Sequence, residues 1–165
     1  MPIVNESDVE AQTVERGGTR FERWPLSRAA ATGGDPELGC SKYELPPGGR
    51  AWPYHYHVGN AEALYVLEGG GLLRKADDEH QLEPGDYVPF PPGERGAHRV
   101  INDGDEPLRY LVMSTMVDPD VTVYPDSGKF GVYAGAPPGG REERTVEGYY
   151  RLDSDVSYWA GEEDD

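Results

Sequence analysis

Apolar residues in this chain fall in short runs that glycine, proline and acidic residues interrupt. Such runs are typical of β-strands, and punctuation by Gly and Pro is typical of tight turns. We predict strands at residues 19–26, 38–45, 51–57, 63–67, 71–75, 80–82, 86–90, 98–101, 108–116 and 121–124. No strand alternates with a long helical pattern, which argues against a doubly wound parallel sheet and predicts an all-β fold.

A length of 165 residues suits one domain with its own core. Residues 1–18 lack sustained periodicity, and we predict that they form an extended N-terminal arm. We assign residues 19–134 to the β-domain and residues 135–165 to a linker, an aromatic segment and an acidic tail. Because free tails rarely carry many aromatic rings, we expect the aromatic segment to pack on the β-domain or on a partner subunit. Its rings are Tyr149, Tyr150, Tyr158 and Trp159.

The charge balance excludes one large class of partners. The chain has 31 acidic and 15 basic residues, a formal net charge of -16. Binding to phosphate backbones needs clustered Lys and Arg, so we do not expect a nucleic-acid partner. Only Lys42, Lys75 and Lys129 are lysines. An acidic, lysine-poor surface is typical of halophilic proteins, although an ordinary acidic protein with an acidic tail remains the alternative.

Neither a membrane span nor a signal peptide is visible. No apolar run approaches the roughly 18 residues needed to cross a bilayer. Residues 1–10 contain neither a basic region nor an apolar segment. The single Cys40 rules out an intramolecular disulfide and is read as a buried, small apolar residue. We therefore expect a cytoplasmic protein.

Candidate metal ligands lie between residues 49 and 69. His55 and His57 are separated by one residue, so on a strand both imidazoles would project from the same face, about 7 Å apart along the backbone. Glu62 follows after a stretch that can turn the chain. Imidazole and carboxylate suit Zn, Fe(II), Mn, Ni or Cu, and no neighbouring cysteine narrows the choice. We therefore predict one divalent transition metal of open identity.

These residues resemble the first motif of the cupin family, which reads Gly, five residues, His-x-His, three or four residues, Glu, six residues, Gly. The matching positions are Gly49, His55, His57, Glu62 and Gly69.

A second cupin motif, Gly, five residues, Pro-x-Gly, two residues, His, three residues, Asn, resembles Gly85, Pro91, Gly93, His98 and Asn102. Residues 94–97 make the turn before His98 two residues longer than in the family pattern, so the sequence leaves the path of this turn open. The resemblance implies that His98 is the fourth metal ligand, beside His55, His57 and Glu62.

The resemblance implies a single-domain double-stranded β-helix, a jelly-roll barrel that binds its metal inside. It also implies several possible activities, including sugar-phosphate isomerases, dioxygenases, decarboxylases and lyases, among which the fold does not choose. Our leading hypothesis is a metal-dependent enzyme with an isomerase-like reaction on a small oxygenated molecule, such as a sugar or sugar phosphate. The alternatives are an Fe(II)-dependent dioxygenase and a non-catalytic metal-containing binding or sensor protein. Paired barrels are common in the family, which implies a homodimer.

The sequence identifies no catalytic base. Tyr65 and Tyr87 lie on predicted strands and are candidates to reach the cavity. Arg95, in the longer turn, could meet an anionic substrate, although a solvated arginine is the simpler interpretation. His80 lies in a charged stretch, and we expect it to be solvated.

The net charge of -16 yields a prediction about salt. Raising KCl from about 0.15 M to about 1 M shortens the Debye length from about 8 Å to about 3 Å and removes most repulsion between surface carboxylates. The melting temperature, followed by circular dichroism, should therefore climb across this range. A flat or falling curve would refute the halophilic interpretation and leave the fold prediction untouched.

Overall fold

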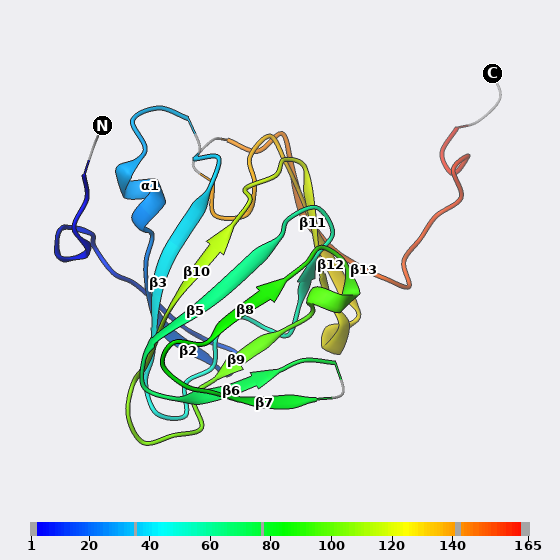
Figure 1. Cartoon of the computed structure of the whole chain (residues 1–165). Helices are drawn as coiled ribbons and strands as arrows, with labels where there is room; N and C mark the ends of the chain where they lie inside the picture. The colour runs from blue at the N-terminus through cyan, green and yellow to red at the C-terminus, as the bar shows by residue number, and fades with distance from the viewer. Residues whose placement is uncertain (1–2, 35, 77, 141–142, 163–165) are drawn as a thin grey trace.

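The chain folds into antiparallel β-sheets that wrap around one interior (Figure 1), as seen in a computed structural model that describes residues 3–34, 36–76, 78–140 and 143–162. Three sheets have the strand orders β1-β2-β3-β10-β5-β8, β13-β12-β11-β4 and β7-β6-β9. The strands are β1 (Gln12–Arg16), β2 (Thr19–Trp24), β3 (Gly39–Leu45), β4 (Tyr56–His57), β5 (Glu62–Glu68), β6 (Gly71–Arg74), β7 (Glu79–Leu82), β8 (Tyr87–Phe90), β9 (Arg99–Ile101), β10 (Leu108–Ser114), β11 (Asp120–Tyr124), β12 (Lys129–Ala134) and β13 (Val146–Arg151). The prediction of an all-β jelly-roll barrel is confirmed.

Helical structure is confined to short pieces. The α-helix α1 (Leu26–Ala30) is a single short stretch, and the 3-10 turns are Glu6–Asp8, Glu94–Gly96 and Pro125–Ser127. In the described ranges, no helix has the length and apolar character needed to cross a membrane.

One predicted strand is much shorter than expected. Residues 51–57 were predicted as one strand, but only Tyr56–His57 forms β4. Pro53 has no N–H to donate to a ladder, which explains why the pairing is interrupted before β4. On both sides of Pro53 the chain still forms isolated bridges: Arg50 pairs with Ile101 of β9, and His55 pairs with His98, which directly precedes β9.

The segment predicted as an N-terminal arm contributes a strand. β1 pairs with β2 along its whole length and lies at the edge of the six-stranded sheet. The two-residue connection is Gly17 and Gly18, whose φ angles are +58° and +79°. Two consecutive positive φ angles match the twist of a tight hairpin, and glycine adopts them without steric cost.

The aromatic C-terminal segment divides into two parts. β13 pairs with β12, and the Tyr149 hydroxyl lies 2.9 Å from that of Tyr133, so this part packs on the barrel as expected. Beyond β13 the chain leads away from the barrel (Figure 1). There Tyr158 and Trp159 contact each other edge to face and are 85% and 71% exposed. In a single copy of the chain they do not pack on the barrel.

Strand alternation separates interior from surface. In β5, Leu64 and Val66 are buried, whereas Tyr65 and Leu67, on the opposite face, are exposed. Glu62 shares the parity of the buried pair and therefore faces inward. The apolar core contains Phe21, Tyr43, Leu45, Ala51, Leu64, Val66, Leu73, Leu82, Phe90, Val100, Leu108 and Tyr110. The same alternation that builds this core thus carries a carboxylate into the interior.

Candidate metal centre

The backbone brings two distant histidines face to face. The His55 N–H donates to the His98 carbonyl at 3.2 Å, and the His98 N–H donates to the His55 carbonyl at 2.9 Å. Their ring centroids lie 4.8 Å apart. His57, two residues on, sits in β4 opposite Thr122 of β11, and its ring centroid is 5.3 Å from that of His55.

The longer turn before His98 folds compactly. Residues Glu94–Gly96 form a 3-10 turn, and the Gly93 N–H donates to the His57 carbonyl at 2.7 Å. Gly96 is required because a Cβ there would lie 1.9 Å from the Pro91 carbonyl oxygen. The two extra residues are thus taken up in the turn, and His98 still reaches the bridge to His55.

Asn102, at the last position of the second motif, has a structural role. It is fully buried, and its Nδ2 donates to the carbonyls of Leu45 and Glu106, both at 2.8 Å. Its Oδ1 accepts from the Gly104 N–H at 3.0 Å. Because all these partners are backbone groups, Asn102 fixes loops around the site and is not itself a ligand.

Each of the three histidines is oriented by a bond at Nδ1. His55 Nδ1 lies 2.8 Å from the Pro53 carbonyl oxygen, and His98 Nδ1 lies 2.9 Å from the Gly96 carbonyl oxygen. A carbonyl can only accept, so in both rings Nδ1 carries the hydrogen, and in the neutral ring Nε2 keeps a free lone pair. His57 Nδ1 lies 2.6 Å from Oδ2 of Asp120, which assigns the same tautomer to the third ring.

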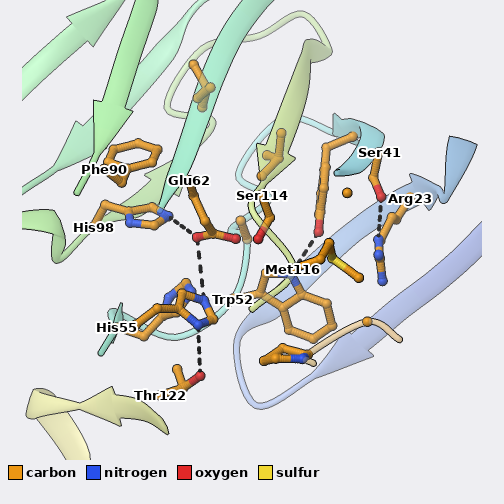
Figure 2. A pocket seen from close by; sticks show the side chains of 18 of the residues that line it. Arg23, Ser41, Trp52, His55, Glu62, Phe90, His98, Ser114, Met116 and Thr122 are labelled. Atoms are coloured by element: carbon orange, nitrogen blue, oxygen red, sulfur yellow. Dashed lines mark hydrogen bonds and ion pairs between the residues drawn. The ribbon is translucent and has the colours of Figure 1, made fainter. Parts of the chain in front are cut away.

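The free ring nitrogens of His57 and His98 lie near Glu62. Its Oε2 lies 3.5 Å from Nε2 of His57 and 3.8 Å from Nε2 of His98. Ligand atoms of His55, Glu62 and His98 all lie within 4.8 Å of one another. Donors about 2.1 Å from a common ion are separated by roughly 3 to 4 Å, so this group could hold a metal. Figure 2 shows His55 and His98 beside Glu62 at one end of a pocket.

All four side chains predicted as ligands are thus gathered at one place. His55, Glu62 and His98 form the compact group, and His57 joins it through Glu62. Each histidine is only 8% exposed, and the Phe90 ring stacks on His98 with centroids 3.7 Å apart. Metal coordination by these four side chains stays a prediction. His80 lies elsewhere, exposed on β7.

Electrostatics favour neutral rings at two positions. Burial lowers the pKa of His55 well below its usual value, and neighbouring His98 and His57 lower it further. Burial also lowers the pKa of His98, and this effect outweighs the charge of Glu62, which raises that pKa. For His57 burial again lowers the pKa, but the Asp120 hydrogen bond and the Glu62 charge outweigh it and raise the pKa overall. His57 is therefore the first of the three to gain a proton on acidification.

Asp120 is a residue of the candidate site that the sequence did not reveal. It is 2% exposed, and its Oδ1 accepts from the Gly59 N–H at 2.9 Å while Oδ2 holds His57. Thr122 adds a contact of 3.1 Å between its hydroxyl and His57 Nδ1. Asp120 and Thr122 alternate on the inward face of β11, a pattern that could have singled them out.

A cavity of about 350 Å³ opens beside the ligand group. Tyr65 and Tyr87, which were candidates for its wall, do not line it: they are 39% and 61% exposed on the outer face. The period-two alternation from Glu62 explains this, because Tyr65 has the opposite parity. Arg95 is exposed and also outside the cavity. Cys40, expected to be buried, is half-buried and lines it.

The tyrosines that do line the cavity come from β3, β10, β11, β12 and β13. They are Tyr43, Tyr110, Tyr124, Tyr133 and Tyr149. Tyr124 stacks near His55, with centroids 6.0 Å apart, and its hydroxyl lies 3.4 Å from that of Tyr133. Burial raises the pKa of Tyr124 and of Tyr133, so both phenols keep their protons at neutral pH.

Replacing His57 by Ala should release most of the bound metal, because one imidazole facing Glu62 is lost. His80→Ala is the matched control, since this exposed histidine is remote from the group. Metal content after dialysis, measured by inductively coupled plasma mass spectrometry, checks this. Equal retention by the two variants would contradict the ligand assignment.

Metal affinity should fall on acidification, because a ring must be neutral to coordinate. The pKa of His57 is raised, so proton competition begins above the ordinary value of about 6.5, whereas His55 and His98 resist protonation until lower pH. The apparent Kd, from titrations against a chelating dye between about pH 8 and about pH 5, should rise throughout the lower half of that range. A constant Kd would be inconsistent with imidazole ligands.

Asp120→Asn should weaken metal binding about 10- to 100-fold, as expected for loss of a carboxylate that orients a ligating histidine. An asparagine can keep one carbonyl oxygen for the Gly59 N–H but then presents an N–H₂ group to His57 Nδ1. Asp118→Asn, at an exposed position two residues earlier and just before β11, is the control. If the same titration gave an unchanged metal affinity for Asp120→Asn, Asp120 would have no role in orienting His57 for the metal.

Comparisons with known proteins agree with this fold. Residues 41–114 match the family described as Cupin domain. Over 65 residues the chain is 37% identical to a glucose-6-phosphate isomerase of Thermococcus litoralis, covering 36% of this chain and 33% of that protein. The chain spans only a third to about half of the length of the curated relatives it matches.

Two crystal structures are similar over nearly the whole chain. A sugar phosphate isomerase of the cupin superfamily from Silicibacter pomeroyi has a TM-score of 0.77 at 23% identity, covering 95% of this chain and 98% of that one. A putative sugar phosphate isomerase from Acidithiobacillus ferrooxidans has a TM-score of 0.78 at 25% identity, covering 94% and 95%. The two histidine motifs, the jelly-roll barrel and the family match together identify residues 41–114 of this chain as a cupin domain.

Proposed function

We propose that this cupin is a metal-dependent enzyme with an isomerase-like reaction on a small oxygenated molecule, a sugar or a sugar phosphate. The observation that carries the proposal is the arrangement of His55, His57 and His98, whose Nδ1 atoms are all engaged. The Nε2 atoms of His57 and His98 both lie near Glu62 Oε2, and all four side chains line one cavity.

The donor set fits a divalent transition metal. Three neutral imidazoles and one carboxylate suit such an ion and leave coordination positions for water or substrate. When bound there, the ion would supply positive charge that stabilises negative charge developing on a substrate oxygen. We propose His55, His57, Glu62 and His98 as its ligands.

Glu62 is our candidate to move a proton in the state in which its carboxylate is not tied to the metal. An aldose–ketose type isomerisation moves a proton between neighbouring carbons, which needs a base within reach. In the described part of the chain, Glu62 and Glu147 are the carboxylates that line the cavity. Glu147 is paired with Arg144 at 2.7 Å, which leaves Glu62 the better placed.

The cavity tyrosines are suited to hydrogen bonding rather than to proton abstraction. Tyr124 and Tyr133 keep their protons at neutral pH because burial raises the pKa of each. Their hydroxyls can donate to hydroxyl or carbonyl oxygens of a polyhydroxylated ligand. A sugar offers many such acceptors, which supports this substrate class.

The test is metal-dependent exchange of substrate hydrogen with solvent. The metal-free protein would be loaded separately with Zn, Fe(II), Mn, Ni or Cu and incubated in D₂O with phosphorylated and free sugars, and loss of C–H signal would be followed by proton NMR. We expect exchange with at least one metal, and none in metal-free protein or in Glu62→Gln. His80→Ala is the matched control and should exchange at the wild-type rate.

The other outcomes assign the competing functions. O₂ uptake by the Fe(II)-loaded protein without hydrogen exchange would favour a dioxygenase. Saturable sugar binding with neither exchange nor O₂ uptake, across all five metals, would favour a binding or sensor protein and contradict the enzyme proposal.

We also propose that the chain is a homodimer. The support is the set of exposed apolar side chains on β13 and beyond, among them Tyr150, Val156, Tyr158 and Trp159. Light scattering on the full chain tests this, and a monomer at all concentrations would contradict it.

A further inference from the structure

Arg23 faces the interior of the barrel. Along β2, Thr19 and Phe21 are buried, and Arg23 has the same parity. Successive side chains of a strand point to opposite faces, so Arg23 shares the inward face with the core residue Phe21. It lines the cavity together with Ser41 and Tyr43.

A hydrogen bond holds the guanidinium of Arg23 in place, but no carboxylate among the described residues neutralises its charge. Its Nε donates to the Ser41 hydroxyl at 3.1 Å, and its central carbon lies 6.0 Å from the Tyr43 ring centroid. Among the described residues it makes no ion pair, whereas Arg74 pairs with Asp126 and Arg144 with Glu147.

This arrangement is unusual in a chain of net charge -16. Acidic residues are abundant in the chain, yet Arg23, which lines the cavity, has no carboxylate partner among the described residues. Guanidinium groups removed from bulk water are normally paired with an anion, and their planar fork suits the oxygens of phosphate or carboxylate. An inward guanidinium without a protein carboxylate therefore points to an anionic ligand.

A second cation lines the same cavity. Arg28, on α1, is half-buried and, within the described ranges, forms no ion pair. Figure 2 places Arg23 and Ser41 at the opposite end of the pocket from His98, with Glu62 between them. The cavity thus has the candidate ligand group at one end and Arg23 at the other. Arg99, which follows His98, lines the cavity as well.

We infer that Arg23, held by Ser41 and assisted by Arg28, binds the phosphate of a phosphorylated sugar whose other end reaches the histidine group. We call Arg23, Arg28 and Ser41 the anion subsite. The identity of the sugar rests on the function proposed above, whereas the preference for an anion rests on the subsite itself. A neutral sugar would leave the guanidinium unpaired, so Arg23 determines specificity.

The test compares ligands that differ only in charge. Isothermal titration calorimetry on the full chain would measure the Kd of a hexose 6-phosphate, the free hexose, the corresponding sugar acid and inorganic phosphate. Wild-type protein should bind the phosphorylated sugar more tightly than the free hexose, and inorganic phosphate should compete with it. Arg23→Gln should raise the Kd of the phosphorylated sugar about 10- to 100-fold and change the Kd of the free hexose less than about twofold.

Three controls separate recognition from folding. Arg20→Gln makes the same change in charge on the outward face of β2 and should leave every Kd unchanged. Arg23→Lys keeps the charge but loses the planar fork, so its affinity for the phosphorylated sugar should lie between wild type and Arg23→Gln. Raising KCl should weaken binding of the phosphorylated sugar more in wild type than in Arg23→Gln, which keeps only Arg28 as a cation of the subsite.

Several results would overturn the inference. They are equal affinities for the phosphorylated sugar in Arg23→Gln and Arg20→Gln, tighter binding of the sugar acid than of the phosphate, or wild-type protein that binds no phosphorylated ligand. The proposed function can fail separately, because Arg23-dependent phosphate binding without hydrogen exchange would leave the subsite standing. If wild type and Arg23→Gln exchanged hydrogen of the phosphorylated sugar at the same rate, the isomerase proposal would stand and the anion subsite would be contradicted.

Discussion

The site depends on three hydrogen bonds at histidine Nδ1. The acceptors are the Pro53 carbonyl for His55, the Gly96 carbonyl for His98 and the Asp120 carboxylate for His57. Each bond fixes both the rotation of a ring and the nitrogen that keeps its lone pair. Without them the rings could turn or change tautomer, and the approach of two Nε2 atoms to one oxygen of Glu62 would have no consequence for binding. The barrel keeps these acceptors in place because His55 and His98 are also joined by two backbone hydrogen bonds.

The same strands divide the interior into regions of different character. Alternation along β5 directs Glu62, Leu64 and Val66 inward, and alternation along β2 directs Phe21 and Arg23 inward. Apolar members of these faces build the core, while the polar members at the strand ends line the cavity. Building a site on paired strands restricts the movement of its ligands more than building it on loops would. Strand register therefore places Glu62 in one part of the cavity and Arg23 in another, without separate loops.

Much of the fold could be predicted from local pattern. Nine of the ten predicted runs correspond closely to observed strands, because Gly and Pro mark the turns and apolar residues mark the interior. The exception is residues 51–57, where Pro53 cannot donate to a strand ladder and only Tyr56–His57 pairs. The glycine pair that closes the β1–β2 hairpin is a known turn signal and was overlooked. The strands β12 and β13 lie outside the predicted runs.

The candidate ligands were predictable because they occur in two compact motifs. Alternation along β11 indicates that Asp120 faces inward, but its pairing with His57 was not predictable, since 63 positions separate the two and no local pattern links them. Tyr65 and Tyr87 were misplaced because their parity relative to Glu62 was not followed along the sheet. Arg23 was missed for a related reason: an arginine in a short run is normally taken as solvated, and only the register of β2 shows that it faces inward.

The most direct test of the central claim is anomalous diffraction from crystals of protein purified without added metal and then soaked with one divalent ion. We predict a single strong anomalous peak, bound by Nε2 of His55, His57 and His98 and by an oxygen of Glu62, with ligand distances of about 2.0 to 2.2 Å. A peak coordinated through Nδ1, a peak that does not involve these four side chains, or no peak after soaking would contradict the account.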